Sequence, residues 1–153
     1  MKADLSLLEE GGGSVAAEIL AGLTQWFARQ EAVASYVALA QTHPTIIVRD
    51  GTAAIGFLTL KDHFGIQSEI AVMGVRATHH RAGFGTALVQ RAIKEAAARG
   101  ARYLTVKTLG AESADAGYAK TRAFYGAVGF LPFENLIGVW GADTPCLQML
   151  RPL

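Results

Sequence analysis

The sequence has little cysteine, no excess of charge of one sign and no long apolar run, and each absence excludes a class of protein. A single cysteine, Cys146, cannot form an internal disulfide, which argues against a small secreted protein stapled by disulfides. The formal net charge is +1, so no basic surplus indicates nucleic-acid binding. No apolar run approaches the roughly 20 residues of a membrane span, and residues 1–10 lack the apolar block of a signal peptide. We therefore expect a cytoplasmic protein that binds neither nucleic acid nor membrane.

What the sequence does have is the composition of one globular domain. The chain has 153 residues, of which 51% are hydrophobic and 18% are charged. This length suits a single domain with a sizeable core, and neither a repeat nor a domain boundary is evident. Residues 1–153 are expected to form one domain.

Apolar periodicity and turn residues predict the order β–α–α–β–β–β–α–β–α–β–β. The pair Asp50-Gly51 between two β runs indicates a hairpin, and helical spacing of apolar residues after Gly83 indicates a helix that Gly100 ends. The sequence therefore predicts a mixed α/β sheet with helices packed on it. The expected β runs are 3–10, 45–62 (the hairpin), 66–76, 102–109, 130–140 and 145–153; the expected helices are 15–23, 31–41, 83–99 and 118–128, with a loop over 109–117.

The segment HHRAGFGTALVQ, residues 79–90, places two glycines at the start of a helix. The first N–H groups of a helix lack partners and carry the positive end of its dipole, so a diphosphate fits there. Gly83 and Gly85 let the backbone approach phosphate oxygens, and Arg81, with His79 and His80, adds charge. Taken alone, the motif also fits a helix start whose glycines serve close packing.

Two common phosphate-binding motifs do not match this segment. A Rossmann fingerprint needs a third glycine, where Leu88 stands, and an acidic residue about 20 positions further on, where Thr105 and Val106 stand. The glycine-lysine signature of a P-loop is also missing. A nucleotide-binding oxidoreductase is therefore disfavoured.

A different motif does match. HRAGFG, His80 to Gly85, resembles the [QR]-x-x-G-x-[GA] acetyl-CoA signature of the GNAT family of N-acetyltransferases, with His80 in place of Gln or Arg and Arg81 beside it as an alternative donor. TRAFYGAVGFLPFE, residues 121–134, resembles the family's late A-x-x-F-Y-x-x-x-G-F motif. The element order also matches, so the resemblance covers nearly the whole chain.

The resemblance implies a GNAT-like acyl-CoA N-acyltransferase fold, with a mostly antiparallel central sheet that splays between two middle strands and is flanked by helices. It implies acetyl transfer from acetyl-CoA, without a metal, by direct attack of an amine in a ternary complex. The acceptor would be a small-molecule or peptide amine, and a homodimer is possible in this family. The alternative is a non-catalytic acyl-CoA-binding module, a sensor or interaction subunit, on the same fold.

The same resemblance assigns cofactor contacts to three segments. The exposed edge of the splayed strand would pair with the pantetheine arm, and Gly74 in it suggests a bulge or close backbone approach. The glycine turn would hold the diphosphate, and a tyrosine would lie beside the thioester sulfur. The residues are Met73, Gly74, Val75, His80, Arg81, Ala82, Gly83, Phe84, Gly85, Thr86 and Tyr125.

Two residues are candidates for catalysis. Tyr125 is expected to donate a proton to the departing thiolate, since a phenol with a pKa near 10 is protonated at neutral pH; the alternative is a packed tyrosine. Glu69 aligns with the glutamate base of several GNAT enzymes and would act through water; the alternative is a solvent-facing glutamate. Strand alternation would place Glu69, Ala71 and Met73 on one face.

For several other residues the sequence leaves both a binding role and a structural role open. Lys107, Lys120 and Arg122 would either reach the 3′-phosphate of CoA or remain solvated charges. The large residues His63, Phe64, Trp26, Phe27 and Trp140 would either line the acceptor cleft or pack in the core. Adjacent His79 and His80 lack a third ligand for a metal, and Cys146 is expected to be a buried, inert residue. A near-neutral chain without an acidic cleft motif does not indicate polyamines or aminoglycosides as acceptors.

Overall fold

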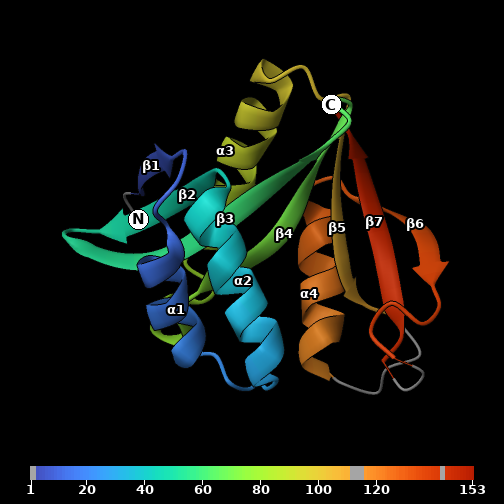
Figure 1. The fold of residues 1–153 in the computed structure, drawn as a ribbon. Coiled ribbons are helices and arrows are strands. Elements are labelled where there is room, and N and C mark those ends of the chain that lie inside the picture. The colour runs from blue at the N-terminus through green and yellow to red at the C-terminus, as the bar shows by residue number, and fades with distance from the viewer. Residues whose placement is uncertain (1–2, 111–115, 142–143) are drawn as a thin grey trace.

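The computed structural model describes residues 3–110, 116–141 and 144–153. In these ranges the chain forms one seven-stranded sheet with the order β1-β2-β3-β4-β5-β7-β6 (Figure 1). All neighbouring strands are antiparallel except β4 and β5, which are parallel. The predicted mixed, mostly antiparallel sheet is confirmed. Its strands are β1 (Asp4–Leu8), β2 (Thr45–Asp50), β3 (Ala53–His63), β4 (Gln67–Val75), β5 (Tyr103–Leu109), β6 (Leu131–Leu136) and β7 (Cys146–Pro152); the helices are α1 (Gly13–Ala21), α2 (Gln30–Thr42), α3 (Phe84–Ala98) and α4 (Ala116–Ala127), with a 3-10 turn over Ala77–His79.

The element order agrees with the prediction, and the main differences are at element ends. The final helix begins at Ala116 rather than at residue 118, and the predicted strand over 130–140 is confined to β6. Residues 111–115 of the predicted loop lie outside the described residues. The hairpin at Asp50-Gly51 is confirmed: Asp50 pairs with Ala53, and Gly51 has a φ of 64°.

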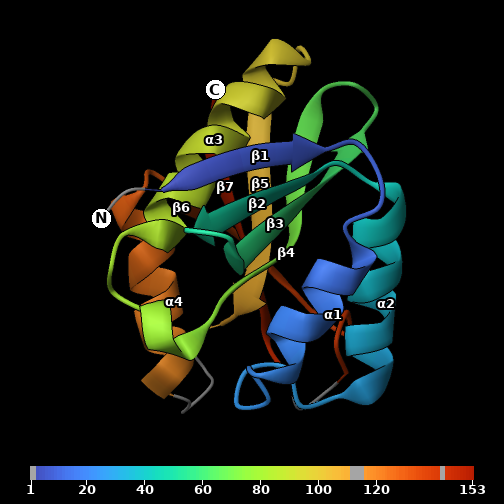
Figure 2. The same cartoon turned by 90° about the vertical axis from the view of Figure 1, so that its left-hand side faces the viewer.

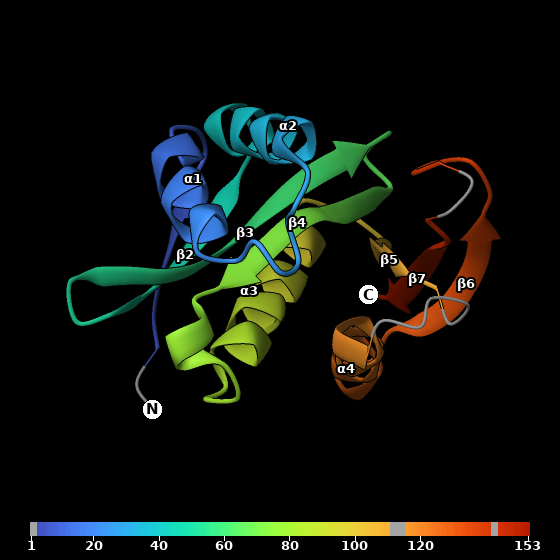
Figure 3. The ribbon, with the colours of Figure 1, turned by 90° about the horizontal axis from the view of Figure 1, so that it is seen from below.

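Helices cover both faces of the sheet: α1 and α2 lie on one side, and α3 and α4 on the other (Figures 2 and 3). Two apolar clusters fill the space between these layers. On the α1–α2 side, Ile19 and Leu20 pack with Phe57 and Val72. On the other side, the predicted apolar stripe of α3 is buried against the sheet.

The central feature is the separation of β4 from β5. The two strands pair from Gln67 with Tyr103 only as far as Ile70 with Val106. Beyond that point both strands continue without pairing to each other, and Figure 1 shows them meeting at one end and diverging toward the other. The predicted splay between two middle strands is confirmed, and it opens the sheet between the two helical layers.

A bulge in β4 reverses its side-chain alternation. Thr59 pairs with Val72 and Leu60 pairs with Ile70, so Ala71 is an extra residue without a partner on β3. Ile70 belongs to the α3-side cluster, whereas Val72 belongs to the α1–α2 cluster.

The expectation that Glu69, Ala71 and Met73 share one face was therefore wrong. The extra residue turns the rest of the strand over, and Met73 packs on the α3-side cluster. The bulge lies at Ala71 rather than at Gly74. Gly74 instead permits a close approach, because a Cβ there would lie 3.0 Å from Cδ1 of Leu23.

Candidate functional site

A cavity of about 800 Å³ lies where β4 and β5 separate. It reaches through the sheet, because its wall includes Tyr36 from α2 on one side and Tyr125 from α4 on the other. Most of the predicted cofactor residues line it, and the exceptions are Ala82 and Phe84. The catalytic candidate Glu69 does not line it either. The lining residues are Leu23, Gln25, Trp26, Phe27, Tyr36, Ile70, Ala71, Val72, Met73, Gly74, Val75, His79, His80, Arg81, Gly83, Gly85, Thr86, Val106, Lys107, Thr108, Tyr118, Lys120, Thr121, Phe124, Tyr125 and Trp140.

The turn before α3 presents backbone N–H groups to one end of this cavity. Gly83 caps the helix with a φ of 87°, a left-handed conformation that suits glycine. The helical hydrogen bonds begin with Ala87 N to Gly83 O at 3.0 Å, so the N–H groups of residues 84–86 have no helical partner. Because the Phe84 side chain is buried in the core, the group through which Phe84 can contact a ligand is its backbone N–H. An anion such as a diphosphate fits this arrangement.

Gly85 and Arg81 complete the turn. A Cβ on Gly85 would lie 3.3 Å from the ring of Phe124, so a larger residue there would push against α4. Arg81 is exposed, with a φ of 62°. Its guanidinium makes no hydrogen bond or ion pair within the described ranges, and it lines the cavity. It can therefore supply a positive charge to an anion at the helix start.

The two histidines of this turn are held by protein groups. Nε2 of His80 donates to the Val75 carbonyl at 2.6 Å, and its ring meets Trp26 edge-on at 5.4 Å. Nε2 of His79 lies 3.1 Å from the Asp50 carboxylate. These contacts fix the turn to β4 and to the β2–β3 hairpin.

Tyr125 stands in the wall formed by α4, between Phe124 and Phe130 at centroid distances of 5.3 and 5.6 Å. Burial, together with the nearby Tyr118 hydroxyl, raises the pKa of Tyr125. Within the described part of the chain no hydrogen bond occupies its hydroxyl. Tyr125 therefore carries its proton at neutral pH and can donate it into the cavity.

Thr108 lines the cavity, but its Oγ1 is enclosed and makes no hydrogen bond with described residues. An unsatisfied buried hydroxyl costs about 1–3 kcal/mol. A ligand in the cavity can reach this oxygen only if the Thr108 side chain rotates.

Glu69 lies at the centre of a charged cluster on the α2 side. Oε1 accepts from His63 Nε2 and Oε2 accepts from Lys107 Nζ, both at 2.8 Å. Burial acts to raise the pKa of Glu69, but the hydrogen bonds and charges of Lys107 and His63 outweigh it, so the pKa is below its ordinary value. The carboxylate is ionised at neutral pH.

The cluster bears on two interpretations left open by the sequence, those of Glu69 and Lys107 as solvated charges. Glu69 is neither solvent-facing nor unpaired, and Lys107 is an ion-pair partner, with the side chains 13% and 29% exposed respectively. Sequence reasoning missed His63 and Lys107 as partners of Glu69. The available signal was a carboxylate in an apolar strand, which needs a partner, with a lysine on the neighbouring strand.

Aromatic residues cover the α1–α2 side of the cavity. Trp26, Phe27 and Trp140 all line it. Trp26 and Phe27 also pack on the α1–α2-side cluster, so these two residues belong both to the cavity wall and to the core. The Tyr118 hydroxyl donates to the Trp26 carbonyl at 2.9 Å. Arg29 Nη2 donates to Thr144 Oγ1 at 3.1 Å. These bonds join the α1–α2 connection to α4 and to the segment before β7.

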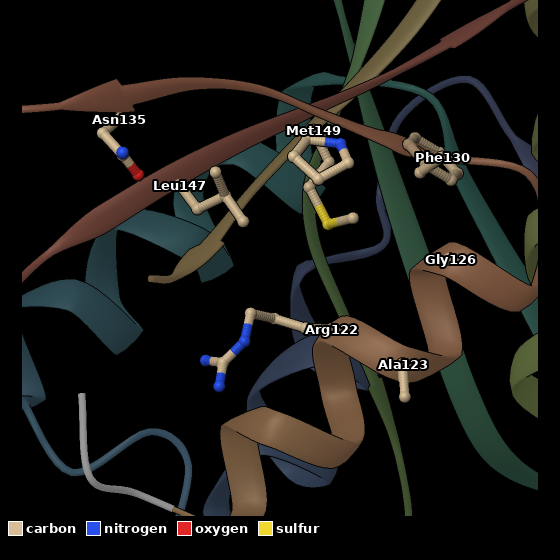
Figure 4. A pocket seen from close by; sticks show the side chains of 8 residues that line it. Arg122, Ala123, Gly126, Phe130, Asn135, Leu147 and Met149 are labelled. Carbon is tan, nitrogen blue, oxygen red and sulfur yellow. The ribbon is translucent and has the colours of Figure 1, made fainter. Parts of the chain in front are cut away.

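A smaller hollow of about 520 Å³ lies between α4 and strands β6 and β7 (Figure 4). Its wall is mostly apolar, and Arg122 at its edge donates to the Gly110 carbonyl at 3.1 Å. Neither catalytic candidate and no residue of the glycine turn lines it. We therefore place the candidate site in the larger cavity.

Within residues 3–110, 116–141 and 144–153, no three His, Cys, Asp or Glu side chains gather as metal ligands, and no helix is long and apolar enough to cross a membrane. Cys146 is buried in β7, as expected. The pKa of its thiol is above the ordinary value, mainly because burial raises it; the Lys107 charge lowers this pKa and the Glu69 charge raises it. The thiol is therefore a poor nucleophile.

Comparisons with known proteins agree with this fold. The model of the Acetyltransferase (GNAT) family matches residues 15–130, whereas a comparison with curated proteins finds no match. Solved structures share the fold at low identity. The ribosomal-protein-S18-alanine N-acetyltransferase from Escherichia coli is 17% identical with a TM-score of 0.78 (99% of this chain, 94% of that chain). The aminoglycoside 6′-N-acetyltransferase from Enterococcus faecium is 19% identical with a TM-score of 0.74 (97% and 96%). A GNAT family acetyltransferase from Elizabethkingia anophelis with acetyl-CoA bound is 14% identical with a TM-score of 0.72 (97% and 98%).

Proposed function

The chain belongs to the acetyltransferase (GNAT) family, and from that premise we propose that it transfers an acetyl group from acetyl-CoA to an amine by direct attack in a ternary complex. The observation that carries the proposal is the cavity through the splayed sheet, which holds an anion-binding helix start, the Tyr125 hydroxyl and an aromatic far side in one continuous space.

In this proposal, different residues bind different parts of acetyl-CoA. The N–H groups at the start of α3, with Gly83, Gly85 and Arg81, hold the diphosphate. The edge of β4 over residues 73–75 that faces the gap binds the pantetheine arm, apart from the Val75 carbonyl, which His80 occupies. His80, Ala82 and Thr86 support the turn. Acetyl-CoA supplies the acetyl group as a thioester.

The reaction forms a C–N bond and breaks a C–S bond. The amine reacts without its extra proton, which passes through water to the ionised carboxylate of Glu69, because Glu69 itself does not line the cavity. Each carboxylate oxygen of Glu69 has a second lone pair available for that water. The β4 backbone N–H groups stabilise the negative charge on the carbonyl oxygen. The Tyr125 hydroxyl gives a proton to the departing thiolate, and the second proton that the nitrogen loses as it becomes an amide returns to Tyr125.

Release of CoA from acetyl-CoA tests the proposal, measured across amino acids, peptide N-termini, amines, polyamines and aminoglycosides. Acceptor-dependent release that Tyr125→Phe and Glu69→Gln both reduce supports the enzyme and its two catalytic residues. Acetyl-CoA binding with no release for any acceptor supports the alternative, a non-catalytic acyl-CoA-binding module. A homodimer and a cytoplasmic location remain predictions; sedimentation analysis and cell fractionation test them.

A further inference from the structure

We infer that the acceptor is an amine that carries both an aromatic body and a carboxylate, the chemistry of an aromatic amino acid. The inference rests on the proposed function and names its substrate class. It follows from the wall of the cavity on the α1–α2 side of the sheet, where a second substrate would meet the splayed strands opposite α4.

The aromatic part of the inference comes from four rings on that wall. Trp26 and Phe27 belong to the α1–α2 connection, Tyr36 belongs to α2, and Trp140 lies between β6 and β7. The Phe27 and Tyr36 rings meet edge to face at 5.9 Å. A planar apolar group gains contact area and ring-edge interactions in such a site, whereas a fully hydrated polar acceptor gains neither.

The carboxylate part comes from Lys107. Its side chain projects from β5 to the α2 side and lines the cavity. One of its three ammonium donors is used by Glu69 at 2.8 Å, which leaves two donors for an anionic group. No Asp or Glu stands among the described residues of the cavity wall. That part of the wall therefore offers a polycationic acceptor no partner.

The placement of Lys107 also suits the reaction. Lys107 and Thr108 are consecutive on β5, so their side chains point to opposite faces of the sheet. An α-amino group is separated from its carboxylate by a single carbon. A carboxylate bound at Lys107 therefore keeps the amine in the gap between the two faces, where the acetyl group arrives from the Thr108 and Tyr125 side.

The chain provides its own binding probe, because both of its tryptophans, Trp26 and Trp140, line the cavity. We would titrate L-phenylalanine, L-phenylalaninamide, phenethylamine and spermidine into the protein in the presence of CoA and follow tryptophan fluorescence. The same compounds would be assayed as acetyl acceptors. We expect L-phenylalanine to bind at least about tenfold more tightly than phenethylamine or the amide, the effect of one charge-assisted hydrogen bond.

Three variants separate the carboxylate contact from general damage. Lys107→Met should remove the preference for L-phenylalanine over phenethylamine, measured as the ratio of the two dissociation constants in the same variant, so that a general effect of breaking the Lys107–Glu69 pair cancels. Lys107→Arg keeps the charge and should restore most of the preference. Lys94→Met, which removes an exposed charge on α3, is the matched control and should change neither value.

Each outcome decides the inference. Equal or tighter binding and faster acetylation of phenethylamine, the amide or spermidine by the wild-type protein would overturn it, while acetyl transfer itself would uphold the proposed function. A preference for L-phenylalanine that survives in Lys107→Met would also overturn it. Carboxylate-dependent binding without acetylation of any compound would uphold the binding site and defeat the proposed function instead.

Discussion

The rings of His80 and Trp26 meet in a T-shaped arrangement with centroids 5.4 Å apart, while Nε2 of His80 donates to the Val75 carbonyl at 2.6 Å. One side chain thereby joins the glycine turn before α3, the edge of β4 and the aromatic wall of the cavity. The family motif that the turn resembles has Gln or Arg at this position. The histidine therefore links two regions of the candidate site that are separate along the sequence.

Replacing His80 with Gln should affect the acceptor more than the cofactor. Glutamine can still reach Val75 but cannot provide a ring for Trp26, so the α1–α2 connection loses a contact. We expect acetyl-CoA affinity within about threefold of wild type and an acceptor KM raised about three- to tenfold, the effect of losing roughly 1 kcal/mol of ring contact. Steady-state kinetics with each substrate varied in turn measures both. A defect confined to acetyl-CoA affinity would show that His80 serves the phosphate instead.

Tyr125→Phe should lower kcat about a hundredfold, in the range for loss of a general acid, with acetyl-CoA affinity changed less than threefold. Because burial raises the pKa of Tyr125, its hydroxyl stays protonated from pH 6 to 9 and the defect should be the same across that range. Rate–pH profiles of both proteins provide the measurement. Full activity of the variant at every pH would rule out the acid role.

Glu69→Gln should reduce stability in a pH-dependent way. The native pKa of Glu69 lies below its ordinary value of 4.5, so the ionised carboxylate stabilises the fold above about pH 4.5, and the effect is lost as the pH falls through the lower native pKa. We expect a loss of about 1–3 kcal/mol at pH 7, since charge-assisted hydrogen bonds are broken, and a difference that shrinks as the pH falls below 4.5. Urea unfolding at several pH values tests this. A difference that stays constant as the medium becomes strongly acidic would contradict the ionic cluster.

Two glycines that flank α3 allow a controlled test of the phosphate turn. Gly83 and Gly100 both have a φ of 87°, so alanine at either position should cost about 1–2 kcal/mol of stability. Only Gly83→Ala should also weaken acetyl-CoA binding, about tenfold or more, because only Gly83 lies in the cavity wall. Thermal unfolding and calorimetric titration give the two values. Equal acetyl-CoA affinity in both variants would place the diphosphate elsewhere.

Thr108→Val should separate stability from binding. Removing a buried hydroxyl that lacks a partner among described residues should stabilise the free protein by about 1 kcal/mol. If the pantetheine arm uses that hydroxyl, the same change should weaken acetyl-CoA binding about threefold to tenfold. Unchanged affinity together with higher stability would show that the hydroxyl does not contact the ligand.

Local signals in the sequence predicted most of the fold. Asp50-Gly51 specified the hairpin, and the stripe of α3 specified its buried face, because turn chemistry and helical periodicity act over a few residues. The faces of β4 were predicted wrongly beyond Ala71, since a bulge depends on pairing with a partner strand and leaves no pattern in β4 itself.

The site was predicted unevenly for the same reason. The glycine turn and Tyr125 lie in local motifs, and the structure brings them into one cavity. His63 and Lys107 come from β3 and β5, and their bonds to Glu69 depend on strand register. The joining of Trp26, His80 and Tyr118 likewise depends on tertiary packing that spacing along the chain does not reveal.

The Ala71 bulge has a consequence for how tolerant this chain is to changes in length. Deleting Ala71 would let β3 and β4 pair without interruption, because Leu60 and Thr59 already pair with Ile70 and Val72. Val72 would then follow Ile70 directly and stay on the α1–α2 side, and Met73 would stay on the α3 side, so both clusters would keep their residues. Deleting a paired residue of β4 instead would move every later side chain of the strand to the opposite face, so Ala71 is the position of this strand where the loss of one residue is tolerated best.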